Sequence, residues 1–196
     1  MNKISASALK DIFISGANNI ANNYKEIDAL NVFPIPDGDT GTNMMMTIQS
    51  GVKNISNLES SKCGEIATNF SKGLLLGARG NSGVILSQIF RGFGEAIVNK
   101  QELVLVDFVN AFKKGTERAY KAVLAPVEGT MLTVIREASE RLSEYVDANP
   151  ESNLDEALQE MVVAAKASLK NTPELLPVLK EAGVYRFRWS WCSKNP

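Results

Sequence analysis

The chain has 196 residues and a formal net charge of −1, from 21 Lys and Arg against 22 Asp and Glu. This length allows one domain with a sizeable core, and the balanced charge gives no basic patch of the kind that nucleic acid or an anionic membrane requires. Histidine is absent, which excludes Ser-His-Asp hydrolysis, histidine-ligated zinc and a phosphohistidine relay. Carboxylates, hydroxyls, backbone groups and bound metal must therefore perform any chemistry.

The N-terminal stretch 1–21 predicts neither a signal peptide nor a membrane span. It carries three charged residues, and its longest apolar run is only Ile12 to Ile14. The only two cysteines, Cys63 and Cys192, lie far apart in the sequence, so no disulfide framework is implied. We expect a cytoplasmic protein.

Apolar residues recur at three- and four-residue spacing along most of the chain, which predicts an all-α fold. The expected helices are 5–24, 42–54, 65–76, 82–97, 103–124, 130–146, 153–169 and 173–182. Because the connections are short, we expect antiparallel neighbours in an up-and-down bundle or barrel of eight helices. Pro173 is expected in the first turn of the last helix with Thr172 as its N-cap, and Gly183 just past its end. A strand competes with helix only at 104–106.

A pair of carboxylates, Asp37 and Asp39, precedes the second helical pattern in a stretch that glycine and proline keep out of regular structure. Carboxylate oxygens are ligands that Mg²⁺ prefers, with waters and substrate phosphates completing its shell. Thr40, Thr42 and Asn43 add donors at a helix N-terminus, where anions are favoured. An Asp-Gly turn with a Thr or Asn N-cap is the alternative for such a pair standing alone.

A second glycine-rich loop, 77–83, joins two apolar helical patterns. Its backbone N–H groups predict a concave nest for an anion, and Ser82 is expected as an N-cap or a phosphate donor. It is neither a Walker A loop nor a Rossmann fingerprint, because no Gly-Lys-Ser/Thr follows and no strand precedes it. A close-packed turn between helices explains it equally well. Arg79 either neutralises phosphate or pairs with a surface carboxylate.

The third loop, 126–132, again places a Gly-Thr pair, Gly129 and Thr130, at the start of a helical pattern. Three helix N-termini of similar design occur in one small chain. We therefore expect one anionic ligand to gather them.

Three long segments, 31–44, 71–88 and 121–130, closely resemble the N-terminal nucleotide-binding domain of the ATP-binding component of bacterial fatty acid kinase. The resemblance runs from about residue 14 to 184. That domain is similar to the ATP-binding L subunit of dihydroxyacetone kinases, a barrel of eight antiparallel helices with the nucleotide and two Mg²⁺ ions at one end. The resemblance therefore implies one DhaL-like domain over 1–184 that binds ATP or ADP and two Mg²⁺ ions.

The resemblance also assigns site residues. It gives the metal and the catalytic role to Asp37 and Asp39, and it places Asn31, with its neutral carbonyl, where related enzymes carry a third carboxylate. The contacts that it implies for the nucleotide and its phosphates fall on Thr40, Gly41, Thr42, Asn43, Arg79, Gly80, Asn81, Ser82, Gly83, Gly129, Thr130 and Met131.

The implied reaction transfers the γ-phosphoryl group of ATP to a fatty acid carboxylate held by a separate acyl-binding protein, giving an acyl phosphate. Phosphoryl transfer needs mainly positioning and charge neutralisation, and an ionised acceptor needs no general base. Family members carry C-terminal domains thought to engage that partner, so the chain resembles an isolated N-terminal piece; a homodimer is left open. The alternatives are a non-catalytic nucleotide-binding regulatory module and an L-type subunit of a dihydroxyacetone kinase.

The tail 185–196 departs from the resemblance, which implies approximately V-D-[AS]-G-G-x-G after residue 184. Tryptophan has the single codon TGG, so a following T gives GGT, glycine, one nucleotide later. Read in that frame, the codons of Arg186 to Cys192 can spell Asp-Ser-Gly-Gly-x-Gly. We therefore expect a frameshift, with a divergent aromatic tail or a vector scar as the alternative.

Overall fold

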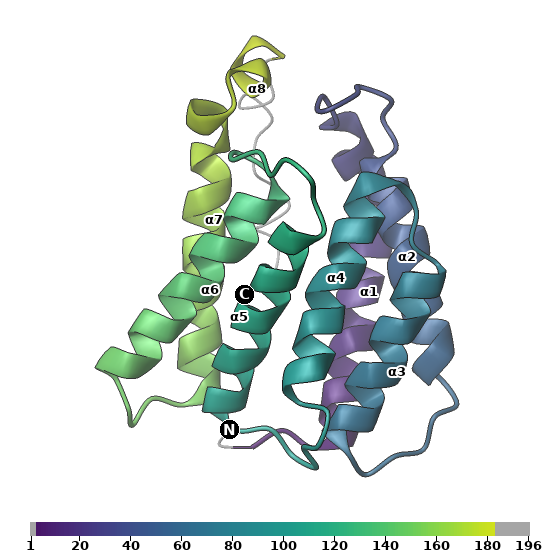
Figure 1. Ribbon diagram of the computed structural model, residues 1–196, viewed down its shortest axis with the longest axis vertical. Coiled ribbons are helices and arrows are strands. Elements are labelled where there is room, and N and C mark those ends of the chain that lie inside the picture. Colours follow the sequence, from purple (N-terminus) through teal and green to yellow (C-terminus); the bar gives the residue numbers. More distant parts are fainter. Residues whose placement is uncertain (1–2, 183–196) are drawn as a thin grey trace.

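The computed structural model describes residues 3–182, and this part of the chain is all-α, as the sequence predicts. The seven long helices run antiparallel to their neighbours in sequence, and each packs against the next along the chain (Figure 1). The helices are α1 (Ala6–Ala29), α2 (Thr40–Ile55), α3 (Cys63–Leu76), α4 (Gly80–Ala96), α5 (Leu105–Lys121), α6 (Met131–Ala148), α7 (Leu154–Leu175) and α8 (Pro177–Glu181).

The main hydrophobic core is formed mostly by side chains from the first five helices, α1 to α5. Aromatic rings lie at its centre. Phe13 of α1 stacks on Phe70 of α3 with ring centroids 4.4 Å apart, and Phe90 and Phe93 of α4 meet the Phe13 ring edge-on. Phe70 is fully buried. Such aromatic pairs add directional contacts to the hydrophobic burial, and they join α1, α3 and α4.

The helices α4 and α5 form the most extensive helix pair of the described chain. Gly92 makes this close approach possible: a Cβ there would lie 2.4 Å from the carbonyl oxygen of Lys114 and 2.7 Å from the Cα of Gly115. The backbones meet where neither residue carries a side chain. The second half of α4 is thereby packed closely against α5.

The C-terminal helices differ from the prediction. Pro173 does not begin a helix: it lies in the last turn of α7, and Pro177 is the residue at the start of α8. Pro173 has no N–H for the carbonyl of Leu169, and the hydroxyl of Thr172 donates to that oxygen instead at 2.8 Å. Thr172, the predicted N-cap, thus supplies the hydrogen bond that Pro173 cannot donate. Helix α7 continues to Leu175 rather than ending at Leu169.

The possible strand at 104–106 is not formed. Val104 is the N-cap residue of α5, and its N–H donates to the carboxylate of Asp107 at 3.0 Å. Only Leu103 pairs in a sheet-like manner, through an isolated bridge to Ile4 among the described residues.

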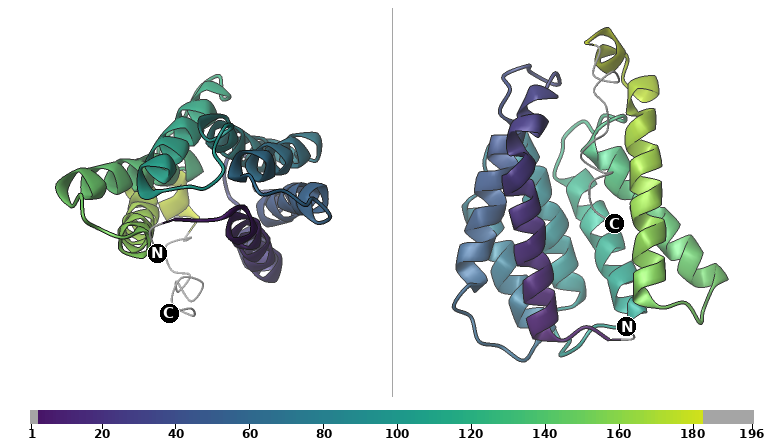
Figure 2. Two further views of the ribbon diagram at one scale, coloured as in Figure 1. Left: turned by 90° about the horizontal axis from the view of Figure 1, so that it is seen from below. Right: turned by 180° about the vertical axis from the view of Figure 1, so that it is seen from behind.

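Figure 2 shows α1 and α7 on the same side of the bundle, with α2 and α3 on the outer side of α1 and α6 on the outer side of α7. Helices α1 and α7 do not pack extensively against each other within the described residues, where α8 is only five residues long. None of the described helices has both the length and the apolar character needed to cross a bilayer. The expected stop at Gly183 and the whole 185–196 tail lie outside the described residues.

Candidate functional site

The three predicted loops lie at one end of the helix bundle. Because the long helices alternate in direction, α2, α4 and α6 all begin at that end, which is the upper end in Figure 1. The loops 30–39, 77–79 and 122–130 precede them. The antiparallel order therefore brings the three N-termini to the same side of the protein.

The second loop is in direct contact with the first turns of α2. The N–H of Arg79 donates to Oγ1 of Thr47 at 3.1 Å, and that hydroxyl donates to the carbonyl of Asn43 at 2.7 Å. Gly83 leaves room for this contact, since a Cβ there would lie 2.3 Å from the Thr47 oxygen. Gly80 has a φ of +58°, and a Cβ there would lie 2.5 Å from Nδ2 of Asn43. The two glycines thus let the start of α4 sit against the start of α2.

The predicted metal carboxylates, Asp37 and Asp39, are both exposed. Asp39 is the N-cap residue of α2, yet its side chain does not cap the helix. Neither carboxylate has a hydrogen-bond or ion-pair partner among the described residues. Both are therefore free to bind a cation.

Asn31 braces the carboxylate loop. Its side-chain oxygen accepts the N–H groups of Asp39 and Thr40, both at 3.2 Å, and its Nδ2 donates to the carbonyl of Ile35 at 2.9 Å. Both lone pairs of that oxygen are thus occupied by backbone donors. The role of Asn31 as a metal ligand stays a prediction, and its observed contacts are those of a loop support.

Asp28, near the end of α1, is a site residue that the sequence did not reveal. Its carboxylate accepts both the N–H of Thr42 at 2.9 Å and the hydroxyl of Thr42 at 2.7 Å. The donors of Thr42 that the sequence assigned to phosphate are therefore already used. Asp28 does not join Asp37 and Asp39, because no described cluster of three or more acidic or cysteine side chains could hold a metal ion.

Removing this tie should cost stability. We expect Asp28→Ala to lower the free energy of unfolding by about 1–2 kcal/mol, as loss of an N-terminal helix cap does. The control is Asp11→Ala, an exposed carboxylate on the same helix, which should change stability by less than about 0.5 kcal/mol. Urea unfolding followed by circular dichroism measures both. Equal stabilities of the two variants would contradict the assigned role.

The second loop leaves its helix start open. Arg79, and not Ser82, is the N-cap residue of α4, and no side chain caps this helix. The Ser82 hydroxyl lies 3.5 Å from the carbonyl of Thr40, which is long for a hydrogen bond. No carboxylate of the described chain pairs with the exposed Arg79 side chain. The backbone donors of the first turn, with Ser82 and Arg79 beside them, thus have no side-chain cap.

The third loop is organised differently. The hydroxyl of Thr130 caps α6 by accepting the N–H of Leu132 at 3.3 Å. Gly129 has a φ of +81°, and its surroundings belong to the end of α7: a Cβ there would lie 2.9 Å from the carbonyl oxygen of Thr172. This loop lies at the site end of the bundle, and its Gly129 packs against the end of α7. No hydrogen bond or ion pair joins it to the starts of α2 and α4 among the described residues.

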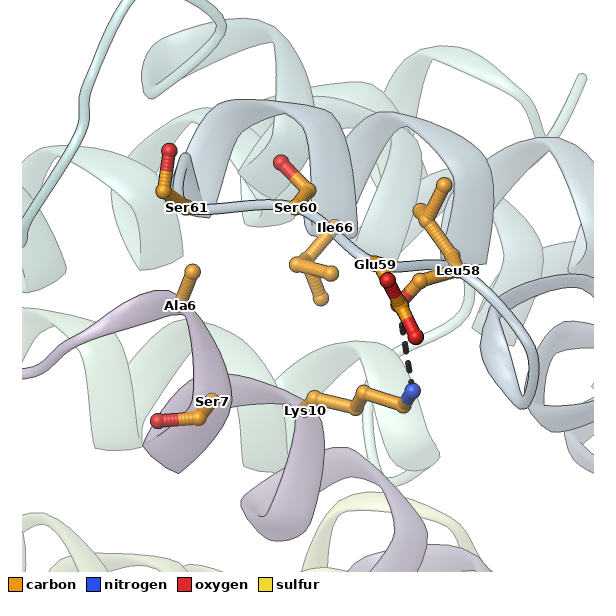
Figure 3. Close-up of a pocket in the computed structure, with 8 residues that line it drawn as sticks. All are labelled: Ala6, Ser7, Lys10, Leu58, Glu59, Ser60, Ser61 and Ile66. Carbon is orange, nitrogen blue, oxygen red and sulfur yellow. Dashed lines mark hydrogen bonds between the residues drawn. The ribbon is translucent and has the colours of Figure 1, made fainter.

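Figure 3 shows a pocket at the opposite end of the bundle, between the first turns of α1 and the loop that follows α2. The ammonium group of Lys10 is held there by the carbonyl oxygens of Ser56 at 2.8 Å and Leu58 at 3.2 Å. The Lys10 ammonium group thus donates hydrogen bonds to backbone carbonyls just after the C-terminal end of α2. This pocket is therefore separate from the loops that the sequence singled out.

Comparison with known proteins places the chain in a family. Residues 34–187 match the DAK2 domain, so the chain belongs to the DAK2 domain family. It is 50% identical over 184 residues to an uncharacterized protein of Staphylococcus epidermidis and 49% identical over 184 residues to one of Staphylococcus aureus strain USA300. These matches cover 94% of this chain but 33% of each relative. The chain therefore spans about a third of the length of these relatives.

The DAK2 domain belongs to the dihydroxyacetone kinase family, which binds ATP or ADP. The chain is thus a kinase-related nucleotide-binding module. The open N-terminus of α4 and the exposed carboxylates beside it agree with that class, because phosphate is favoured at uncapped helix starts.

Proposed function

We propose that this chain is the ATP- and Mg²⁺-binding domain of a fatty acid kinase. In this function it supports transfer of the γ-phosphoryl group of ATP to a fatty acid carboxylate that a separate acyl-binding protein holds. The observation that supports the proposal is the packing of the start of α4 on the start of α2, where the Ser82 hydroxyl lies 3.5 Å from the carbonyl of Thr40, the residue after Asp39. The carboxylates of Asp37 and Asp39 have no partner among the described residues. The Pro34-x-Pro36 spacing and the Gly-Thr-Asn that follows Asp39 favour the fatty acid kinase branch.

The donor set fits Mg²⁺. Asp37 and Asp39 would hold it, because Mg²⁺ is commonly bound through one or two carboxylates, with waters and phosphates as further ligands. The described residues offer no cluster of three such side chains of the kind that a structural zinc site requires. When bound, the metal would neutralise charge on the phosphates.

The chain's own residues bind and orient the nucleotide. The N–H groups of Gly80, Asn81 and Ser82 lie in the first turn of an uncapped helix, where they favour an anion. The exposed guanidinium of Arg79 supplies positive charge next to them. A fatty acid carboxylate is already ionised at neutral pH, so the acceptor needs no base from this chain.

The Ser82 hydroxyl is expected to add one hydrogen bond to phosphate. We expect Ser82→Ala to weaken ATP binding in Mg²⁺ by about 10-fold, because a hydrogen bond to a charged group is worth about 1.5–3 kcal/mol. Ser61→Ala, at the opposite end of the bundle, is the control and should bind as the wild type does. Calorimetric titration measures both. Unaltered binding by Ser82→Ala would leave Ser82 without a role in the site.

A turnover assay tests the reaction itself. The full-length protein, mixed with an acyl-binding protein loaded with fatty acid, should convert ATP to ADP and form acyl phosphate. Phosphorylation of dihydroxyacetone, or nucleotide retained through purification, would favour the dihydroxyacetone kinase type instead. Nucleotide binding with no turnover on either acceptor would indicate a regulatory module and contradict the proposal.

A further inference from the structure

A polar cluster holds the third loop from both neighbouring helices. We call it the loop clamp, and it consists of Tyr120 of α5, Glu128 of the loop, and Thr133 and Arg136 of α6. The Glu128 carboxylate accepts the Tyr120 hydroxyl at 3.0 Å, the Thr133 hydroxyl at 2.6 Å and Nη2 of Arg136 at 3.2 Å. Nε of Arg136 also donates to the Tyr120 oxygen at 3.2 Å. One carboxylate is thus bound by three side chains.

The clamp reaches the loop backbone through Thr133. This side chain is fully buried, and its hydroxyl oxygen accepts the N–H of Gly129 at 2.8 Å while donating its own proton to Glu128. Gly129 itself stands at a φ of +81°, a conformation that only glycine adopts readily. The unusual backbone conformation at Gly129 is therefore held by consecutive hydrogen bonds, from the Gly129 N–H to Thr133 and from Thr133 to Glu128.

The residues that follow this turn start α6. The Thr130 hydroxyl donates to the carbonyl of Val127 at 2.8 Å and caps the N–H of Leu132, so the loop closes on its own helix. The sequence assigned the nucleotide contacts of this loop to Gly129, Thr130 and Met131. Their placement depends on side chains that lie outside that trio.

The charge states support an intact clamp at neutral pH. The hydrogen bond from Thr133 lowers the pKa of Glu128, so the carboxylate is ionised and accepts all three donors. Burial raises the pKa of Tyr120, so its hydroxyl keeps the proton that it donates. Glu128 is nonetheless about half exposed, and solvent screening limits how strongly this carboxylate can hold its partners.

We propose that Tyr120, Glu128, Thr133 and Arg136 are positioning residues that fix the loop 127–131 for the nucleotide and so raise its affinity without touching it. This inference rests on the proposed function. These four side chains would affect nucleotide affinity indirectly, by holding the backbone of the loop through the Gly129 N–H.

Substitutions that remove single polar groups test the clamp. Tyr120→Phe and Glu128→Gln each remove polar contacts of the clamp while nearly preserving the size and shape of the side chain. Glu140→Gln is the matched control, because Glu140 pairs with Arg136 at 3.1 Å but does not contact the loop. The first readout is hydrogen exchange of the Gly129 amide in the ligand-free chain. The second is the ATP dissociation constant in Mg²⁺, and helicity by circular dichroism confirms folding.

We expect Gly129 to exchange about 5-fold faster in Tyr120→Phe and Glu128→Gln, with ATP affinity about 3- to 10-fold weaker. Tyr120→Phe removes the hydroxyl that contacts Glu128 and Arg136, and Glu128→Gln removes the negative charge and one acceptor oxygen. Glu140→Gln should match the wild type in both. Thr133→Ser should keep the affinity that Thr133→Val loses, since only the serine retains the hydroxyl.

Unchanged exchange and affinity in Glu128→Gln would overturn the clamp. Faster exchange with unchanged affinity would show a brace of the fold only, and would overturn the positioning role. A wild-type chain that binds no ATP would overturn the proposed function, and the positioning role with it, while Gly129 exchange would still report whether the clamp exists.

Discussion

Replacing either loop carboxylate, as Asp37→Asn or Asp39→Asn, is expected to weaken Mg²⁺-dependent ATP binding by roughly 100-fold or more while leaving the helical fold intact. The loss should be large because each carboxylate supplies a negative oxygen ligand, and such ligands contribute several kcal/mol to holding a metal and its phosphates. The fold should survive because both side chains are exposed and partner no described residue.

Calorimetric titration of ATP, with and without Mg²⁺, measures this effect. Asp147→Asn is the matched control, since it makes the same change at an exposed position on α6. It should bind ATP as the wild type does. If Asp37→Asn and Asp39→Asn both kept wild-type affinity, the metal would have to be held elsewhere.

Adding one methyl group at Gly92 should cause a large loss of stability. We expect Gly92→Ala to lower the free energy of unfolding by about 2–3 kcal/mol, because overpacking a close contact displaces backbone as well as side chains. The new Cβ would meet the Lys114 carbonyl and the Gly115 Cα, neither of which can swing away as a flexible side chain could. The start of α4 would shift with the rest of that helix.

The control is the same substitution in open space. A Cβ at Gly16 of α1 would meet nothing within 4 Å, so Gly16→Ala should raise stability by about 0.5–1 kcal/mol through the lower entropy of the unfolded chain. Urea unfolding compares the two variants. A Gly92→Ala variant as stable as Gly16→Ala would show that α4 and α5 are not held so closely.

Much of the fold follows from local patterns. Helical periodicity predicts all of the long helices, and short connections make them antiparallel. The sequence therefore predicts that the three glycine-containing helix starts share one end, as observed for α2, α4 and α6. The side-by-side placement of the first two starts is also expected, although Gly83 proves to make room for Thr47 rather than for a ligand alone.

The errors arise where a specific hydrogen bond or an earlier helix start, and not the residue pattern, decides a local structure. Helix α7 passes through Pro173 because the Thr172 hydroxyl replaces the missing donor, which no propensity describes. The contact of Asp28 with Thr42 joins two helices across a turn, so sequence spacing alone did not reveal it. The same holds for Ser82, which gives up the N-cap position to Arg79 because the α4 helix begins earlier, at Gly80.

Hydrogen exchange on the wild-type chain, with and without Mg²⁺ and ATP, tests the central claim most directly. The account predicts that Mg²⁺ and ATP together slow exchange in segments 37–43 and 79–83, because both loops then contact the metal and the phosphates. Segment 56–62, beside the pocket at the other end of the bundle, should exchange unchanged. Protection confined to that far end, or no protection of either loop at saturating ATP, would contradict the account.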